Sequence, residues 1–116
     1  MPTNDLKART KQFALSAIRL CSHLPAKLEL QVISRQLIRA ATSVAANYRA
    51  VCRARSKADF VNKLSIVEEE ADESAFWLEM LLELQPGEKA ALLKLNNEAS
   101  QLTAIMVSSR KTARGN

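Results

Sequence analysis

The stretch that decides the fold is LQVISRQLIRAATSVAANYRAV, residues 30–51. Most of its apolar residues recur three or four positions apart, which is the spacing of one face of an α-helix. They are Leu30, Ile33, Leu37, Ala40, Ala41, Val44, Tyr48 and Val51. A continuous apolar face of this length predicts a helix over about residues 27–54 that packs against other helices.

Three further segments show the same periodicity, and they predict helices over about residues 4–23, 57–84 and 87–110. Their apolar faces consist of Leu6, Phe13, Ala17, Leu20 and Leu24, then Phe60, Leu64, Val67, Ala71, Leu78, Leu81 and Leu82, and finally Leu92, Leu95, Ala99, Leu102 and Met106. The tail, residues 111–116, carries no pattern and is expected to fray.

Short breaks separate the four segments. Pro25 ends the first segment, and Pro86–Gly87 form a turn before the fourth. Ser56 is placed to cap the third helix, and Asp59, three residues further on, is placed to accept a hydrogen bond from the backbone N–H of Ser56. The chain has only two glycines and three prolines, and 4% of its residues are aromatic. Residues 1–116 are therefore expected to form one all-α domain, an antiparallel up-down-up-down four-helix bundle.

Charge is distributed unevenly along the chain. The net charge is +5, but residues 1–58 hold eleven basic and two acidic residues, whereas residues 59–116 hold six basic and ten acidic ones. Such a division favours either a polyanionic partner or contacts between the two halves, within a subunit or between subunits.

Several basic residues of the first half form a stripe on the second helix, opposite its apolar face. The stripe and its continuation comprise Arg35, Arg39, Arg49, Arg53, Arg55 and Lys57, with Ser43 and Asn47 as secondary candidates. Arginine can bind a phosphate through two parallel hydrogen bonds, so this surface is a candidate for contact with a nucleic-acid backbone. The stripe contains no aromatic residue on which a base could stack, which argues against base-specific readout of single strands.

An acidic run offers the arginines a different partner. Seven acidic residues and no basic one occur between Glu68 and Glu83 on the third helix. The second helix of one subunit and the third helix of a neighbour could pair through these charges. The protein would then be an oligomeric interaction scaffold without a nucleic-acid role. The two hypotheses differ in whether the stripe stays exposed in the assembly.

The third helix carries more apolar surface than one bundle needs. Ile66, Trp77, Met80 and Leu84 fall together, away from the main apolar face. Either Trp77 lies over the edge of a wide core, or these residues form the subunit interface of a homo-oligomer.

Other classes of function find little support. His23 is the only histidine, so the sequence predicts no catalytic set, no metal site and no cofactor. A third hypothesis is a magnesium-dependent enzyme, for which Glu70 and Glu73 would have to converge in a pocket. No apolar run approaches the ~20 residues that span a bilayer, and the N-terminus is polar, so we expect a cytoplasmic protein without membrane contact.

Several spaced pieces of the chain resemble a known family. They are ISRQLIRAATSVAANYR at 33–49, RARSKADFVNKLSI at 53–66 and EEADESAFWLE at 69–79. These pieces are similar to the four-helix-bundle proteins encoded in 23S rRNA intervening sequences. The similarity is in register over about residues 24–82, and Ala50 departs from the acidic residue that relatives often carry.

The resemblance implies a bundle fold, no known enzymatic activity and assembly into a homopentamer. The similar accessory proteins of diversity-generating retroelements bind nucleic acid and a reverse transcriptase through a basic surface. The positions that match this surface are Arg35, Arg39, Arg49, Arg53, Arg55 and Lys57. The leading hypothesis is therefore a non-enzymatic homo-oligomer that binds RNA or DNA, with an unidentified protein as a further partner.

Overall fold

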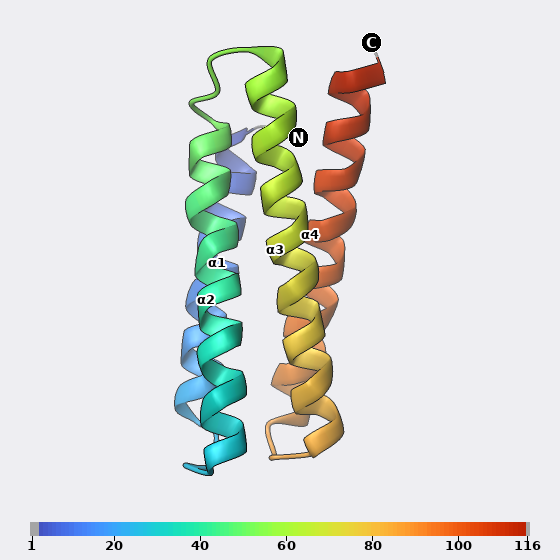
Figure 1. Ribbon diagram of the computed structural model, residues 1–116. Coiled ribbons are helices and arrows are strands. Elements are labelled where there is room, and N and C mark those ends of the chain that lie inside the picture. Colours follow the sequence, from blue (N-terminus) through green and yellow to red (C-terminus); the bar gives the residue numbers. More distant parts are fainter. Residues whose placement is uncertain (1–2, 116) are drawn as a thin grey trace.

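The computed structural model describes residues 3–115, which form four α-helices and no strand. The helices are α1 (Thr3–Ser22), α2 (Leu28–Val51), α3 (Lys57–Leu84) and α4 (Lys89–Gly115). They run alternately up and down; each packs against its neighbours in sequence, and α1 also contacts α4 (Figure 1). The predicted all-α bundle is confirmed. It is elongated, measuring 47 × 21 × 19 Å, so its two ends are well separated.

The apolar faces predicted from the sequence form the core. Every residue of the predicted face of α2 is buried, and so is every predicted core residue of α4. The predicted residues of the first and third segments are buried too, except for Leu24, Phe60 and Leu82, which are half-buried against the core. Periodicity locates the core because an amphipathic helix in a bundle buries one face only.

The turns that join the helices explain two differences from the predicted bounds. α2 ends at Val51 and not at residue 54, and the chain then leaves the helical conformation before Ser56, whose extended backbone (φ −159°, ψ 168°) is that of a residue capping α3. α4 begins at Lys89 and not at residue 87, because Gly87 and Glu88 have left-handed φ angles of 99° and 58°.

The predicted cap of α3 is largely confirmed. The Ser56 hydroxyl accepts a hydrogen bond from the Asp59 N–H at 3.1 Å, which satisfies one of the free amides at the helix start. The Asp59 carboxylate accepts from the N–H of Arg55 at 3.1 Å, and not from that of Ser56 as the capping-box pattern predicted. The loop between α2 and α3 is thereby tied to the first turn of α3.

The C-terminal tail, residues 111–116, is expected to fray, but residues 111–115 are helical; residue 116 lies outside the described residues. α4 continues to Gly115. Its last turns are held against α3, because Arg110 Nε donates a hydrogen bond to Glu68 Oε1 at 2.8 Å. Residues 107–114 contain neither Gly nor Pro, so nothing in the local sequence ends the helix earlier.

Within residues 3–115, no helix is both long enough and apolar enough to cross a membrane. The two cysteines are not paired: Cys21 is half-buried and Cys52 is exposed.

Candidate nucleic-acid interface

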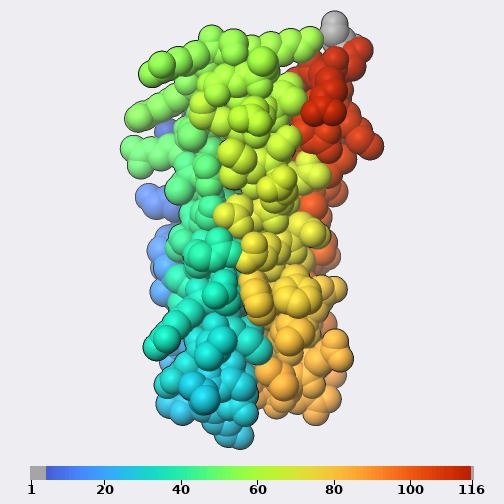
Figure 2. Space-filling view, viewed as in Figure 1, coloured from blue at the N-terminus to red at the C-terminus, as the bar shows by residue number. Residues whose placement is uncertain are grey.

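The arginines of α2 are all exposed, but they do not point in one direction. Ten residues separate Arg39 from Arg49, and at about 100° per residue this turns the two side chains about 80° apart. Arg39 leans toward α3, whereas Arg49 is turned away from it. Figure 2 shows long side chains from the C-terminal end of α2 and the following loop projecting into solvent on the side away from α3.

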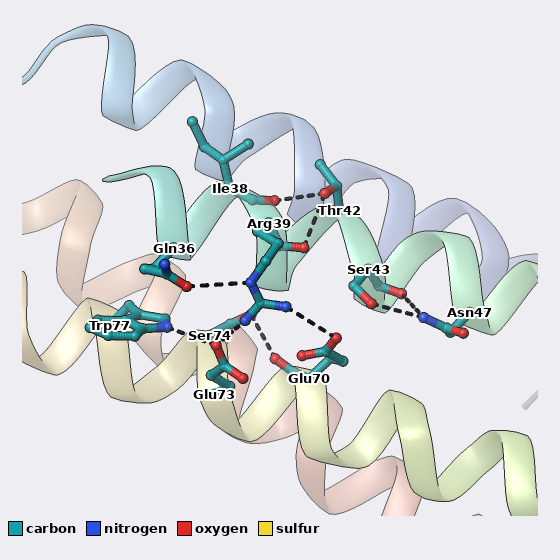
Figure 3. A network of polar contacts seen from close by, with 10 residues as sticks. All are labelled: Gln36, Ile38, Arg39, Thr42, Ser43, Asn47, Glu70, Glu73, Ser74 and Trp77. Carbon is teal, nitrogen blue, oxygen red and sulfur yellow. Dashed lines mark hydrogen bonds and ion pairs between the residues drawn. The ribbon is translucent and has the colours of Figure 1, made fainter. Parts of the chain in front are cut away.

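Arg39 is engaged by α3 of its own chain (Figure 3). Its guanidinium forms ion pairs with Glu73 and with Glu70, the latter at 3.4 Å, and its Nε donates to Gln36 at 3.4 Å. Glu73 also accepts a hydrogen bond from the Trp77 indole Nε1 at 3.0 Å. The basic stripe and the acidic run therefore meet at this position within one subunit.

This network shifts the titration of Glu73. The Trp77 hydrogen bond lowers the pKa of the Glu73 carboxyl most, burial acts in the opposite direction, and Arg39 lowers it further. A carboxyl whose pKa is depressed by folding stabilises the protein above its unfolded pKa, near 4.5. That stabilisation is lost as the pH falls through the lower folded value.

We therefore expect Glu73→Gln to lower the free energy of unfolding at pH 7 by up to about 1 kcal/mol, since the pair is partly exposed. The difference from the wild type should shrink as the pH falls below about 4.5. Denaturant unfolding followed by Trp77 fluorescence at several pH values measures it. Glu69→Gln, an exposed carboxylate of α3 without an ion pair in residues 3–115, is the matched control. A Glu73→Gln difference that persists undiminished at pH 3 would contradict this interpretation.

The cations at the C-terminal end of α2, in the following loop and at the start of α3 are unpaired in the part of the chain that the structure describes. Among residues 3–115, no carboxylate forms an ion pair with Arg49, Arg53, Arg55 or Lys57, and all four side chains are exposed. We call these four residues the basic end. Arg35 is also exposed and has no ion-pair partner within residues 3–115, but it lines a groove between α1 and α2. It lies about 21 Å from Arg49 along α2, at a rise of ~1.5 Å per residue.

Asp59, the acid within the first turn of α3, forms no ion pair with the basic end. Its carboxylate is bound by the Lys63 ammonium at 2.6 Å and by the Arg55 backbone N–H. These contacts, with Lys63 contributing most, lower the pKa of Asp59, and the nearby charge of Arg55 also helps to lower it. The carboxylate thus hydrogen-bonds to Lys63 and to the backbone, and not to a guanidinium group of the basic end.

The secondary candidates Ser43 and Asn47 bond to each other. The Asn47 amide donates to the Ser43 backbone oxygen at 2.9 Å and to its hydroxyl at 2.8 Å, as Figure 3 shows. Both residues are half-buried. Their polar groups are used inside the helix, so they add little to an exposed basic surface.

The four residues predicted for a subunit interface are placed differently from one another. Ile66, Met80 and Leu84 are exposed. Trp77 is half-buried against the core, which is the position expected for a tryptophan over the bundle edge. The neighbouring Phe76 is 48% exposed and stacks edge-to-face on Trp77 with a centroid distance of 4.9 Å. Phe76 therefore presents more apolar surface than Trp77 does.

Two apolar residues on α2 that the sequence patterns did not single out are exposed. Leu28 is 77% exposed and Val32 is 50% exposed. They precede Arg35 at helical spacing on the outward face of α2, so the sequence did carry a signal for them.

Because α2 and α3 are antiparallel and Arg39 is level with Glu70 and Glu73, the start of α2 is level with the end of α3 (Figure 1). We call the resulting group the apolar end, which consists of Leu28, Val32, Phe76, Met80 and Leu84.

The magnesium hypothesis required Glu70 and Glu73 to converge in a pocket. They converge instead on the guanidinium of Arg39, which occupies the place where a cation would bind. Residues 3–115 contain no group of three His, Cys, Asp or Glu that could hold a metal ion.

Comparisons with known proteins place the fold in a family. Residues 3–108 match the family described as 23S rRNA-intervening sequence protein. The chain belongs to this family. A crystal structure of a protein of unknown function from the S23 ribosomal protein family of Bacteroides thetaiotaomicron is 32% identical, with a TM-score of 0.85. The similarity covers 96% of this chain and 99% of that one. No curated protein matched the chain.

Membership of the intervening-sequence family confirms the resemblance read from the central part of the sequence. That resemblance was in register only over about residues 24–82, whereas the family match extends over residues 3–108. α1 and most of α4, which lie outside that stretch, are thus part of the family fold as well.

Proposed function

We propose that this member of the 23S rRNA-intervening sequence protein family is a non-enzymatic, cytoplasmic homo-oligomer that binds the phosphate backbone of RNA or DNA. The observation that carries the proposal is the basic end, where Arg49, Arg53, Arg55 and Lys57 are exposed without an ion-pair partner in residues 3–115. Within this proposal Arg39 stabilises the fold, and Arg35 contributes only to the positive electrostatic potential around the basic end.

Four neighbouring cations repel one another in the free protein, and a polyanion relieves that repulsion. Binding to a nucleic-acid backbone also releases the counterions condensed on its phosphates, which is a favourable entropy at low salt. Phe60 is the one aromatic residue in residues 49–63, and it is half-buried against the core. The basic end thus offers charge without a platform for stacking bases, so we expect binding with little sequence preference.

The apolar end is the proposed subunit interface. The start of α2 and the end of α3 together carry five exposed apolar side chains, and large exposed apolar surfaces mark association sites in soluble proteins. We propose a homopentamer, as the family resemblance implies, with the predicted residues Trp77, Met80 and Leu84 at or beside the contact. Ile66 was also predicted for the interface, but it lies about 15 Å from Phe76 along α3 at ~1.5 Å per residue, outside the apolar end. Because the two ends of the bundle are well separated, contact through the apolar end leaves each basic end free. Several weak phosphate contacts on one assembly then combine into higher avidity.

The interaction scaffold without a nucleic-acid role is the second candidate function, and the Arg39 contacts with Glu70 and Glu73 favour it. They show that arginines of the stripe can pair with the acidic helix. They do so within one subunit, however, and at one position of the stripe. The scaffold would need acidic residues of a neighbouring subunit, such as Glu79 or Glu83, to cover the basic end.

Direct binding tests the proposal. The purified protein is titrated against labelled duplex RNA and duplex DNA at low salt, and its mass in solution is measured by light scattering. We expect a multimer that binds both duplexes with dissociation constants below about 1 μM at 50 mM salt, weakening steeply as salt rises. A multimer that binds neither duplex at low salt would support the scaffold instead.

A further inference from the structure

The helical end of α4 brings an additional cation to the basic end. Lys57, the first residue of α3, and Arg114, in the last turn of α4, line the same hollow, which has a volume of about 590 Å³. Both side chains are exposed, and neither has an ion-pair partner within residues 3–115. The two charges therefore face one space from two helices that are far apart in sequence.

The remaining lining of this hollow is uncharged. It consists of Ala58, Val61, Asn62 and Ser65, all from α3. Ser65 donates its hydroxyl to the Val61 carbonyl at 3.2 Å, whereas the exposed Asn62 side chain has an amide free to donate. The groups that the described lining offers to a ligand are thus an ammonium, a guanidinium and a carboxamide, with no carboxylate among them.

Two of the three acids on the adjacent turns of α3 are already bound, and the third, Glu69, is exposed one turn beyond Ser65 without an ion pair in residues 3–115. Asp59 is held by Lys63 at 2.6 Å, and Glu68 is held by Arg110 at 2.8 Å. The second pair also fixes the geometry of the hollow, because Arg110 lies one helical turn before Arg114. Anchoring α4 at Arg110 holds Arg114 beside the start of α3. Ligand binding then does not have to pay the entropy cost of ordering a frayed terminus.

We infer that this hollow binds one phosphate group of the nucleic-acid backbone, which Lys57 and Arg114 hold jointly from α3 and α4. The inference rests on the proposed function and extends its surface from the loop after α2 to the end of α4. The nucleic acid then lies across the end of the bundle and not along the length of α2. Arginine supplies a planar fork and lysine a point charge, a combination suited to an oxyanion.

Two single variants, Lys57→Gln and Arg114→Gln, and their combination test the shared site. Each has a control at the opposite end of the bundle: Lys89→Gln, also the first residue of a helix, and Arg19→Gln, also an exposed arginine. We expect each single variant to bind duplex RNA about tenfold more weakly than the wild type. Each should also lower the slope of log K against log salt by about one, and the controls should change neither quantity.

The double variant decides whether one phosphate is shared. If Lys57 and Arg114 hold the same phosphate, the double variant should bind within about twofold of the weaker single variant, because the second change removes a contact already weakened. Losses that multiply would place the two residues on separate phosphates and overturn the shared site. Helical content and unfolding midpoints are measured for every variant, and we expect them to match the wild type because both side chains are exposed.

The remaining outcomes separate this inference from the function on which it rests. If the wild type binds no duplex at low salt, both fail. If the wild type binds and the two variants behave like their controls, the shared site fails and the proposed function stands. Calorimetry with inorganic phosphate alone tests the other source of the same chemistry: we expect no binding at micromolar concentrations. Micromolar binding that Arg114→Gln abolishes, with duplex binding intact, would assign the hollow to free phosphate.

Discussion

The Phe76→Glu/Met80→Glu variant is expected to be monomeric at concentrations at which the wild type is a homo-oligomer. Both side chains are exposed on the apolar end in the single chain, so the change should leave the bundle folded. In the proposed interface each glutamate would be buried without a partner, at a cost of several kcal/mol per charge. Even about 4 kcal/mol raises the dissociation constant roughly 1,000-fold. Light scattering over a concentration series measures the change.

The matched control is Ala104→Glu/Ser108→Glu on α4. It adds the same two charges at the same spacing of four residues, on two exposed positions outside the apolar end. We expect it to assemble like the wild type. If both double variants assemble, the apolar end is not the subunit interface. If only the control dissociates, the interface lies on α4.

The Arg49→Glu/Arg53→Glu variant is expected to lose at least about 100-fold in affinity for duplex RNA and DNA. Each arginine contributes about 1.5–3 kcal/mol when it hydrogen-bonds a charged phosphate, which is tenfold or more for each residue. The new carboxylates add repulsion from the backbone. Binding is measured by fluorescence anisotropy at 50 mM salt, and light scattering confirms that the assembly is intact.

The Lys89→Glu/Lys94→Glu variant is the control for this loss. It changes the net charge by the same amount, but both lysines lie on the first turns of α4, at the end of the bundle away from the basic end. We expect a reduction of a few fold at most, from the weaker long-range field. An equal loss in the two variants would mean that only net charge matters and that no localised surface exists.

The sequence predicted the core of this protein well because burial in a helical bundle depends on one local property, the period of the apolar residues. All eight residues of the α2 face, from Leu30 to Val51, are buried as predicted. The three positions that were only half-buried lie where helices begin or end, at Leu24 and Phe60, or at the edge of α3, at Leu82. Those positions depend on how neighbouring helices are rotated, which no single segment encodes.

The candidate site was predicted less completely, and Arg39 shows why. In a stripe with spacings of four and three residues, the direction of the side chains changes by tens of degrees around the helix axis. That drift brings Arg39 toward Glu70 and Glu73 and turns Arg49 away from them. The difference depends on the facing surface of α3, which lies more than thirty residues away along the chain for Arg39.

Arg114 was missed for a related reason. The tail was expected to fray because it lacks an apolar pattern, but a tertiary contact between Arg110 and Glu68 extends the helix past that pattern. Leu28 and Val32 are a different kind of omission. Their exposure follows from the same helical spacing that defined the arginine stripe, so the sequence alone could have predicted it.

We propose that the arginine stripe is divided, with Arg49 available to contact phosphate and Arg39 paired with Glu70 and Glu73 on α3 of its own chain. The most direct test compares Arg49→Gln with Arg39→Gln in a salt series of duplex RNA binding, alongside denaturant unfolding. We expect Arg49→Gln to lower the slope of log K against log salt by about one and to leave the free energy of unfolding unchanged. We expect Arg39→Gln to leave the slope unchanged and to lower the free energy of unfolding. The reverse pattern, with Arg39→Gln reducing the slope and Arg49→Gln without effect on binding, would contradict the division.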